Sequence, residues 1–259
     1  MRRIAVISDI HGNWVALDAV LADQRARALD QVVCLGDAIQ GGPQPAETVA
    51  RLRELACPVV MGNADAWLLT GRDTSPSETT TERQRAVREW SLARLSEADR
   101  AFIAAFAPTV TLDLGDRRLR CFHGSPSSFD DIILPETAHD EALRLLGLDG
   151  DAETRNVDIL TGGHTHTQQI RRLGRGFFFN PGSVGLSYSH HQPDGVFRAD
   201  PWAEYAILTV ADEEEKGEGD GRAVALEFRR VPFDREALLH AYRAGDRPDI
   251  EAALAQYGG

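Results

Sequence analysis

The sequence has 259 residues, of which 42% are apolar and 26% charged, and its formal net charge is −12. These values are typical of a globular chain with one large domain or two small ones, and they exclude disorder as the main state. The acidic balance disfavours a binder of long nucleic-acid duplexes, because such a protein needs a basic face.

The first third of the chain alternates strands with helices. Short apolar runs predict strands at 3–8, 31–35 and 58–61. A helix is predicted from an Asn13 cap to about residue 28, and another at 45–56. Strands separated by helices indicate a parallel sheet with right-handed crossovers.

The rest of the chain contains a helical stretch and then hairpins. After a Ser-, Thr- and Pro-rich loop at 71–81, helices are predicted near 82–95 and 97–107, the second with a capping box of Ser96 and Asp99. The other elements are predicted by apolar runs and turn residues. They are hairpins at 109–122, 168–179 and 205–230 (the last with an acidic loop at 212–221), a strand at 157–160, and helices at 136–146, 234–242 and 249–257. Together they form a single layered α/β domain over residues 1–259, parallel first and antiparallel later.

Cysteine content and hydropathy limit which kinds of site and which cellular location the protein can have. Cys34, Cys57 and Cys121 are odd in number and not closely spaced, which argues against a disulfide framework or a cysteine-rich zinc site. Cys34 and Cys121 lie in apolar runs and are expected in the core. No window reaches the roughly 18 apolar residues of a membrane span, and the N-terminus lacks the features of a signal peptide. We therefore expect a cytoplasmic protein with no membrane partner.

Five short segments place Asp, Asn or His directly after predicted strands. In α/β sheets, ligand sites collect at the carboxyl ends of strands, so these residues are expected on one rim. Each segment alone is as well explained by a turn, a helix cap or a structural histidine, but their joint occurrence favours a metal site. The segments are Ser8-Asp9-Ile10-His11-Gly12-Asn13, Gly36-Asp37, Gly62-Asn63-Ala64-Asp65, His123-Gly124 and Gly163-His164-Thr165-His166.

Spacing within these segments supports metal binding. Asp9 and His11 are two residues apart, as are His164 and His166. In an extended segment such pairs point to the same side, so each pair is expected to face one cation. The flanking glycines allow unusual backbone angles and a close approach to a ligand.

The order Asp-x-His, Gly-Asp, Gly-Asn-x-Asp, His-Gly and Gly-His-x-His resembles the calcineurin-like metallophosphoesterase superfamily over about residues 3–232. The stretch from Asn180 to Gly185 resembles its small bacterial and archaeal phosphodiesterase branch. The protein-phosphatase branch carries Asp-Arg-Gly and Gly-Asn-His-Glu, whereas this chain has Gly36-Asp37-Ala38 and Gly62-Asn63-Ala64-Asp65. The resemblance implies a four-layer sandwich, with two mixed β-sheets flanked by helices.

The resemblance also implies a binuclear centre. Asp9, His11 and His166 would hold one metal ion, Asn63, His123 and His164 the other, and Asp37 would bridge them. The two divalent ions would be Mn, Fe, Zn, Co or Ni. Mixed oxygen and imidazole ligands suit all five, so the sequence does not distinguish them, and Mn is the ion that we favour. A water or hydroxide bridging the metals would attack the phosphoester, so no protein nucleophile is expected.

One position departs from the pattern of many superfamily members. Ala64 stands where those members carry a His that protonates the leaving group or stabilises the transition state. Without that acid, we expect phosphodiesters, or esters with acidic leaving groups, to be preferred over alkyl monoesters. Asp65 is expected to orient Asn63 or a loop amide rather than to bind metal.

Two segments outside the motifs are candidates for substrate contact. The polar segment 187–202 contains His190, His191 and Arg198, which are expected to bind substrate or to supply the missing acid; an exposed loop is the alternative. The helical segment at about 71–107 is expected to cap the active site. It carries three arginines that would contact phosphate or lie on a solvated helix face: Arg83, Arg85 and Arg88.

Two other functions fit the same motifs. One is a nucleotide or dinucleoside-polyphosphate hydrolase with the same metals, which only the pocket walls would distinguish. The other is a catalytically silent protein-interaction scaffold, like the phosphoesterase-like subunit of retromer, although that function predicts lost ligands. We expect a phosphoester or nucleotide substrate and no stable nucleic-acid partner, and the sequence leaves open whether the chain forms a homo-oligomer.

Overall fold

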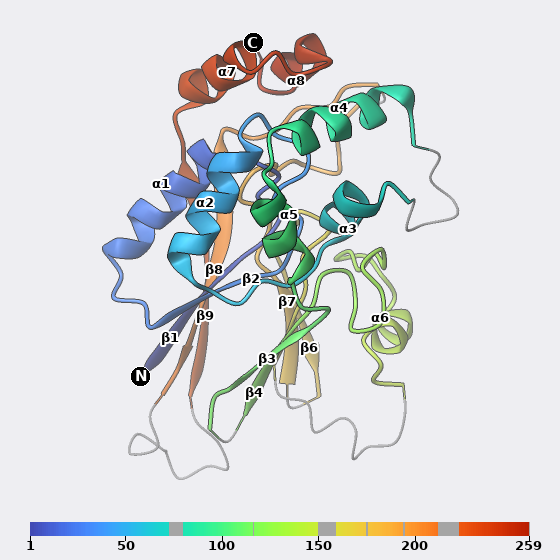
Figure 1. Ribbon diagram of the computed structural model, residues 1–259. Helices are drawn as coiled ribbons and strands as arrows, with labels where there is room; N and C mark the ends of the chain where they lie inside the picture. Colours follow the sequence, from blue (N-terminus) through green and yellow to red (C-terminus); the bar gives the residue numbers. More distant parts are fainter. Residues whose placement is uncertain are drawn as a thin grey trace.

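The computed structural model describes residues 1–72, 80–115, 117–149, 159–174, 176–193, 195–211 and 223–258 (Figure 1). The predicted acidic loop at 212–221, most of the predicted loop at 71–81, and Asp116 of the first hairpin turn lie outside the described residues. The strands are β1 (Arg2–Ile7), β2 (Gln31–Cys34), β3 (Val110–Asp113), β4 (Arg118–Cys121), β5 (Ile159–Thr161), β6 (Gln169–Leu173), β7 (Gly176–Asn180), β8 (Trp202–Val210) and β9 (Val224–Pro232). The helices are α1 (Trp14–Arg25), α2 (Pro45–Leu55), α3 (Asn63–Thr70), α4 (Glu82–Ala93), α5 (Glu97–Ala104), α6 (His139–Leu145), α7 (Arg235–Ala244) and α8 (Ile250–Gln256).

The strands form two mixed sheets, as expected. One has the order β2-β1-β8-β9 and the other β3-β4-β5-β7-β6. Strands β1 and β2 are parallel, as are β4 with β5 and β5 with β7, whereas the remaining pairs are antiparallel. The late hairpin β8–β9 pairs with β1, so it completes the first sheet rather than forming a separate layer.

The sheets pack face to face, with helices on their outer faces (Figure 1). Alternate residues of β1 show this: Ile4 and Val6 belong to the cluster between the sheets, whereas Ala5 and Ile7 belong to the cluster beneath α1 and α2. Helix α6 covers the other sheet through a third cluster that contains Phe178. Because β1 is buried on both faces, it consists almost entirely of apolar residues after its first two positions.

Local capping follows the predictions. Asn13 accepts from the Ala16 amide at the start of α1, and Ser96 and Asp99 form the predicted capping box before α5. A second capping box, formed by Thr81 and Gln84 before α4, was not predicted. Cys34 and Cys121 are fully buried, as expected for core thiols.

Two predictions between residues 58 and 70 were incomplete. The predicted strand at 58–61 is reduced to two isolated parallel bridges, Cys34 with Val59 and Val60 with Ala107. Helix α3 was not predicted, because Gly62-Asn63 reads as a turn and α3 has no side-chain cap at its start. Since α3 begins at Asn63, this candidate ligand lies in the first turn of a helix. Among the described residues, no helix is long and apolar enough to cross a membrane.

A polar cluster on the helix-facing side of the first sheet joins α1 to β8 and β9. Asp23 accepts hydrogen bonds from Arg27 (2.9 Å), Tyr205 (2.6 Å) and Arg229 (3.2 Å). Burial opposes the charged form, but these three hydrogen bonds outweigh it and lower the pKa of Asp23 to about 2.

Replacing Asp23→Asn should lower the free energy of unfolding at pH 7 by about 2 kcal/mol, because the charged acceptor is lost. The folded-state pKa is depressed, so this stabilisation is present above the ordinary value of 3.8 and is lost as the pH falls through about 2. Urea unfolding of both proteins across this range should show the difference shrinking in acid. Asp18→Asn, which removes a partly exposed ion pair with Arg51 (3.1 Å), should change stability by less than about 1 kcal/mol, and an equal loss there would contradict the role of Asp23.

Candidate metal centre

Five of the seven candidate ligands have left-handed backbone conformations. Their φ angles are 54° for Asp9, 49° for His11, 49° for Asp37, 67° for His164 and 54° for His166. The extended geometry assumed for the Asp-x-His and His-x-His pairs is therefore wrong. Asp9 and His11 still belong to one ligand group, as predicted, but His164 and His166 belong to different groups, so the prediction that this pair faces one cation is also wrong. Non-glycine residues rarely adopt such angles, and they concentrate at functional sites where surrounding contacts enforce them.

The first group joins Asp9, His11 and His166 from loops after β1 and β5. The His166 Nε2 lies 3.3 Å from Asp9 Oδ1, and the His11 Nε2 lies 4.0 Å from the same oxygen. The two imidazole Nε2 atoms are 3.1 Å apart. Ligand atoms from all three residues lie within 4.8 Å of one another, as ligands of one ion would.

The second group joins Asp37, His123 and His164, whose ligand atoms also lie within 4.8 Å of one another. Asn63 is close to it, since its Oδ1 lies 3.0 Å from His123 Nε2. Asp37 Oδ2 lies 3.4 Å from His123 Nε2 and 3.9 Å from His11 Nε2. The Asp37 carboxylate therefore lies between the two groups.

Backbone carbonyls determine that Nδ1 carries a proton in three of the imidazoles. The Nδ1 atoms of His11, His123 and His166 lie 2.8, 2.8 and 2.6 Å from the carbonyl oxygens of Gln40, Leu35 and Leu186 respectively. A carbonyl only accepts, so each Nδ1 must donate its proton. In the neutral rings the bare Nε2 then faces the centre, as in histidine ligands of metals.

The groups fit divalent cations in two respects. The bare Nε2 atoms of His11 and His166 repel at 3.1 Å unless a proton or a cation lies between them. Two nitrogens bound at about 2.1 Å to one ion lie about 3–3.4 Å apart, which matches this separation. In addition, Asp9 Oδ1 is buried with no hydrogen-bond partner, a costly arrangement that a cation would relieve.

Two carboxylates and two imidazoles of the centre stabilise one another's charged forms. Although burial opposes it, Asp9 raises the pKa of His166 and Asp37 raises that of His123, and a divalent ion bound there would replace these protons. Burial raises the pKa of Asp9, but His166 outweighs it and holds that pKa below its ordinary value. Asp37 is likewise lowered in pKa because His123 outweighs its burial. Burial lowers the pKa of His11 and His164, and the repulsion from neighbouring imidazoles adds to this effect.

Asp65 holds the loop that carries Asp37. Its carboxylate is fully buried and accepts from the backbone amides of Ala38 (3.0 Å) and Ile39 (3.0 Å). Burial and the nearby Asp37 raise the pKa of Asp65 to about 7, although the two amides favour the charged form. Of the two predicted roles, the structure places Asp65 on loop amides rather than on Asn63.

Two glycines allow the loops to approach each other. Gly36 has a φ of 97°, and a Cβ built on it would collide with the backbone of Gly62. A Cβ on Gly62 would collide with the Asp37 carboxylate. A side chain at Gly62 would therefore displace a candidate ligand directly.

The segment after β7 holds the backbone of Asp9, a member of the first ligand group. The Ser183 hydroxyl donates to the Asp9 carbonyl (2.8 Å), and the Gly185 amide donates to the same oxygen (3.0 Å). The Gly185 carbonyl in turn accepts from Asn13 Nδ2 (3.0 Å) and from the hydroxyl of Tyr257 (2.8 Å), which follows α8. No local sequence pattern indicates this role of Tyr257, because its partner is a backbone atom distant in the chain.

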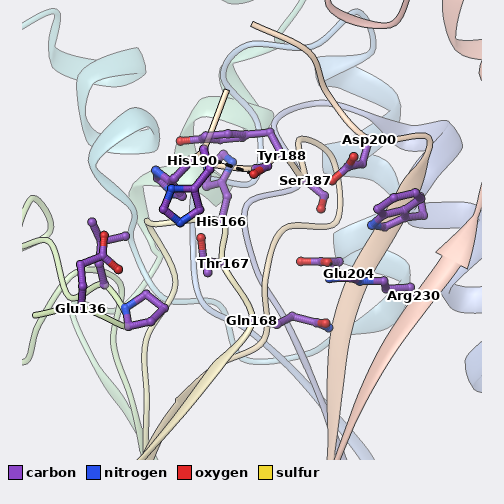
Figure 2. A pocket seen from close by; sticks show the side chains of 15 residues that line it. Glu136, His166, Thr167, Gln168, Ser187, Tyr188, His190, Asp200, Glu204 and Arg230 are labelled. Carbon is purple, nitrogen blue, oxygen red and sulfur yellow. Dashed lines mark hydrogen bonds and ion pairs between the residues drawn. The ribbon is translucent and has the colours of Figure 1, made fainter. Parts of the chain in front are cut away.

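Of the three candidate substrate-binding residues, two lie beside the first ligand group and one does not. His190 and His191 line a cavity of about 350 Å³ that also reaches His166 (Figure 2), and His190 Nε2 lies 2.8 Å from the Thr165 carbonyl. Arg198 is directed elsewhere, since its Nη1 donates to the Ala255 carbonyl in α8 (2.6 Å).

The arginines of α4 are also engaged with other parts of the fold. Arg88 donates to the carbonyls of Trp67 (2.9 Å) and Leu69 (3.3 Å) in α3. Arg83 forms an ion pair with Asp249, and Arg85 is exposed. These contacts hold α4 against α3 and the C-terminal helices.

A model of the calcineurin-like phosphoesterase superfamily domain matches residues 1–212. The chain belongs to this superfamily. Phosphodiesterase YfcE of Escherichia coli K12 is 26% identical to this chain over 198 residues, which cover 72% of this chain and 81% of YfcE. A protein of Methanocaldococcus jannaschii, MJ0912, is 48% identical over 66 residues, but the match spans only 26% of this chain and 27% of that protein.

The fold is shared with a solved member of the superfamily. The crystal structure of a metallophosphoesterase from Sphaerobacter thermophilus superposes with a TM-score of 0.67 at 25% identity, covering 100% of this chain and 99% of the other. Family membership together with the two ligand groups supports metal-dependent hydrolysis of phosphoesters. Helices α7 and α8 lie beyond the region that the family model matches.

Replacing Asp65→Asn should weaken Mn²⁺ binding about 10–100-fold, as expected when a group that orients metal ligands is lost. The Asn oxygen could still accept from both amides at the Oδ1 position, but its NH₂ would face the Ala38 amide where Asp65 Oδ2 now accepts (3.0 Å). Calorimetric titration of metal-free protein with Mn²⁺ measures the effect. The exposed Asp140→Asn on α6 removes the same charge and should leave affinity unchanged; equal losses in both variants would contradict the prediction.

Replacing Tyr257→Phe should weaken Mn²⁺ binding about fivefold, the equivalent of roughly 1 kcal/mol for one lost hydrogen bond. The Gly185 carbonyl keeps its bond from Asn13, so the protein should still fold. Tyr242→Phe removes a hydroxyl from the same cluster of α7 and α8 and serves as the matched control. Unchanged affinity in Tyr257→Phe, measured on protein shown by circular dichroism to be folded, would refute the coupling.

Proposed function

We propose that this protein hydrolyses phosphodiesters with two divalent metal ions. Asp9, His11 and His166 would hold one ion, and the remaining ligands Asn63, His123 and His164 the other, with Asp37 between them. The observation that carries the proposal is the position of Asp37 Oδ2, within 4 Å of an imidazole from each group. The name of YfcE, a phosphodiesterase, supports the diester assignment for this chain.

The charge balance suits an anionic substrate. Two carboxylates among neutral imidazoles and one amide would leave two divalent ions with a net charge of about +2, so the centre attracts phosphate although the whole chain carries −12. When bound, the ions would lower the pKa of a water molecule, orient the phosphoryl group and offset its developing charge. Among Mn, Fe, Zn, Co and Ni, all compatible with mixed oxygen and imidazole ligands, we propose Mn.

Ala64 determines the substrate preference that we propose. Its amide donates to Asp37 Oδ1 (2.8 Å), so this position orients a candidate ligand through its backbone. Its methyl side chain cannot donate a proton to a leaving alcohol. Substrates with acidic leaving groups need no such proton, whereas alkyl monoesters do. His190 and His191, at the cavity beside His166, are proposed to contact the substrate, as is Arg198 if it leaves its Ala255 partner.

The scaffold alternative has less support, because all seven candidate ligands are retained and converge. The same centre would serve a nucleotide or dinucleoside-polyphosphate hydrolase, and the choice between these and a diesterase depends on the cavity walls. We also propose that the protein acts in the cytoplasm and that the helical segment at about 71–107, with α4 and α5, caps the centre.

With Mn²⁺, the protein should hydrolyse bis(p-nitrophenyl) phosphate at least about 100-fold faster, as kcat/KM, than an alkyl phosphomonoester, because general acid catalysis contributes about 10²–10⁴-fold. Release of p-nitrophenol and of inorganic phosphate measures the two reactions. Faster turnover of the monoester would refute the preference.

Asp37→Asn is the matched test of the centre itself. It keeps the shape of the side chain but removes the negative charge between the two groups, so diester turnover should fall by at least about 100-fold and bound metal should decrease. Metal analysis after dialysis provides a second readout. Protein that binds no divalent ion and hydrolyses none of the esters would favour the scaffold function.

A further inference from the structure

The cavity beside His166, called the chamber below, is a half-open pocket next to the candidate metal centre. Its volume is about 350 Å³, and it is lined by residues from the loop at 134–136, the β5–β6 loop, the segment at 187–191, Asp200, β8 and β9. Figure 2 shows Tyr188 above it, His166 and Thr167 on one side, and Glu204 with Arg230 on the other. His166 is thus shared between the candidate metal centre and the chamber, which places the chamber within reach of a substituent on a metal-bound phosphate.

The volume suits one ester group of a diester. Small-molecule sites commonly enclose about 300–1,000 Å³, so this chamber lies at the small end of that range. The phosphoryl group itself would lie at the metal centre, outside the chamber. One alcohol substituent of a phosphodiester would therefore extend past His166 into it.

The charged groups of the chamber are mainly carboxylates. Glu136, Asp200 and Glu204 line it, together with one guanidinium, that of Arg230. Arg230 Nε is already paired with Glu204 Oε1 at 2.9 Å. Glu136 and Asp200 therefore form no ion pair among the described lining residues. Burial raises the pKa of Asp200, and both the charge of Arg230 and a bound cation would favour its charged form. A substituent that carries a second phosphate would be repelled here, whereas a cation would be attracted.

Aromatic rings form another part of the wall, beside aliphatic and neutral polar residues. The Tyr188 ring lies 5.4 Å from the His166 ring and 4.9 Å from those of His190 and Phe197, measured between centroids, which fixes its orientation. The Trp202 ring already has a cation against it, since the Arg230 guanidinium lies 5.3 Å from its centroid. Aromatic faces next to carboxylates are a recurring arrangement for alkylammonium groups.

We infer that the chamber binds the second ester group of a phosphodiester substrate and that this group carries an alkylammonium charge. This inference rests on the proposed function, because the phosphate must be held by the metal centre. It assigns Asp200 and Tyr188 as the residues that select the substrate. It also separates the diesterase from a dinucleoside-polyphosphate hydrolase, whose substrate would bring further phosphates towards Asp200 and Glu204.

The test compares two diesters with the same leaving group. Both p-nitrophenyl phosphorylcholine and the p-nitrophenyl ester of thymidine 5′-phosphate lose p-nitrophenolate when water cleaves the P–O bond, so their intrinsic reactivities are matched. The Mn²⁺-loaded protein should favour the choline ester about tenfold in kcat/KM, as expected for a cation held by an aromatic face and a carboxylate. Equal values, or a preference for the thymidine ester, would overturn the inference and favour a neutral nucleoside.

Substitutions in the chamber test which residues determine the preference for the choline ester. Asp200→Asn should lower the ratio of the two kcat/KM values about tenfold, and Tyr188→Leu should lower it in the same direction, which keeps the test decisive if one variant fails to fold. Asp140→Asn, on the surface of α6, removes one charge outside the chamber and should preserve the ratio. A ratio that falls equally in Asp140→Asn, or in neither chamber variant, would refute the assignment.

Failure of the proposed function can be told apart from failure of this inference. If the protein hydrolyses bis(p-nitrophenyl) phosphate but shows no preference for the choline ester, only the inference is wrong. If no diester is hydrolysed with any divalent ion, the proposed function is wrong. Calorimetric binding of phosphorylcholine against thymidine 5′-phosphate, with and without Asp200→Asn, then still tests the chamber: equal affinities would overturn it.

Discussion

The organisation of the structure depends on the burial of two carboxylates, Asp9 and Asp37, among imidazole side chains. Unpaired buried charge is costly, so this cluster requires partners in fixed positions. The surrounding chain supplies them through backbone atoms: three carbonyls orient imidazoles, and the Ala64 amide holds Asp37. The left-handed residues and the close glycines follow from the same requirement, because only compact loops bring this many donors and acceptors together.

Most of the fold could be predicted from local patterns. The β1 run and the hairpins β3–β4, β6–β7 and β8–β9 are marked by apolar residues between turn residues, and Asn13 and Ser96 by their capping chemistry. The helix α3 could not be predicted, because Gly62-Asn63 has the local signature of a turn and tertiary contacts determine that it begins a helix. The insertion of β8 beside β1 is a non-local pairing that periodicity does not encode.

The candidate centre was predictable for a different reason. Its residue types recur after successive strands, so their convergence followed from the topology even though the extended backbone assumed for Asp9 and His11 was wrong. The groups that support the centre were less accessible to prediction. Leu35, Gln40 and Leu186 act through carbonyl oxygens, which every residue possesses, and Tyr257 acts on the backbone of Gly185 from the other end of the chain. The direction of Arg198 towards α8 likewise depends on packing that the sequence does not reveal.

The strand order β2-β1-β8-β9 also constrains how the protein is made. During synthesis β1 and β2 emerge early, but the other edge of β1 has no partner until β8 has left the ribosome about 200 residues later. An apolar strand with an open edge is prone to pair with other chains. The first sheet should therefore close late, and crowding of nascent chains, rather than weakness of the finished core, should limit the yield of folded protein.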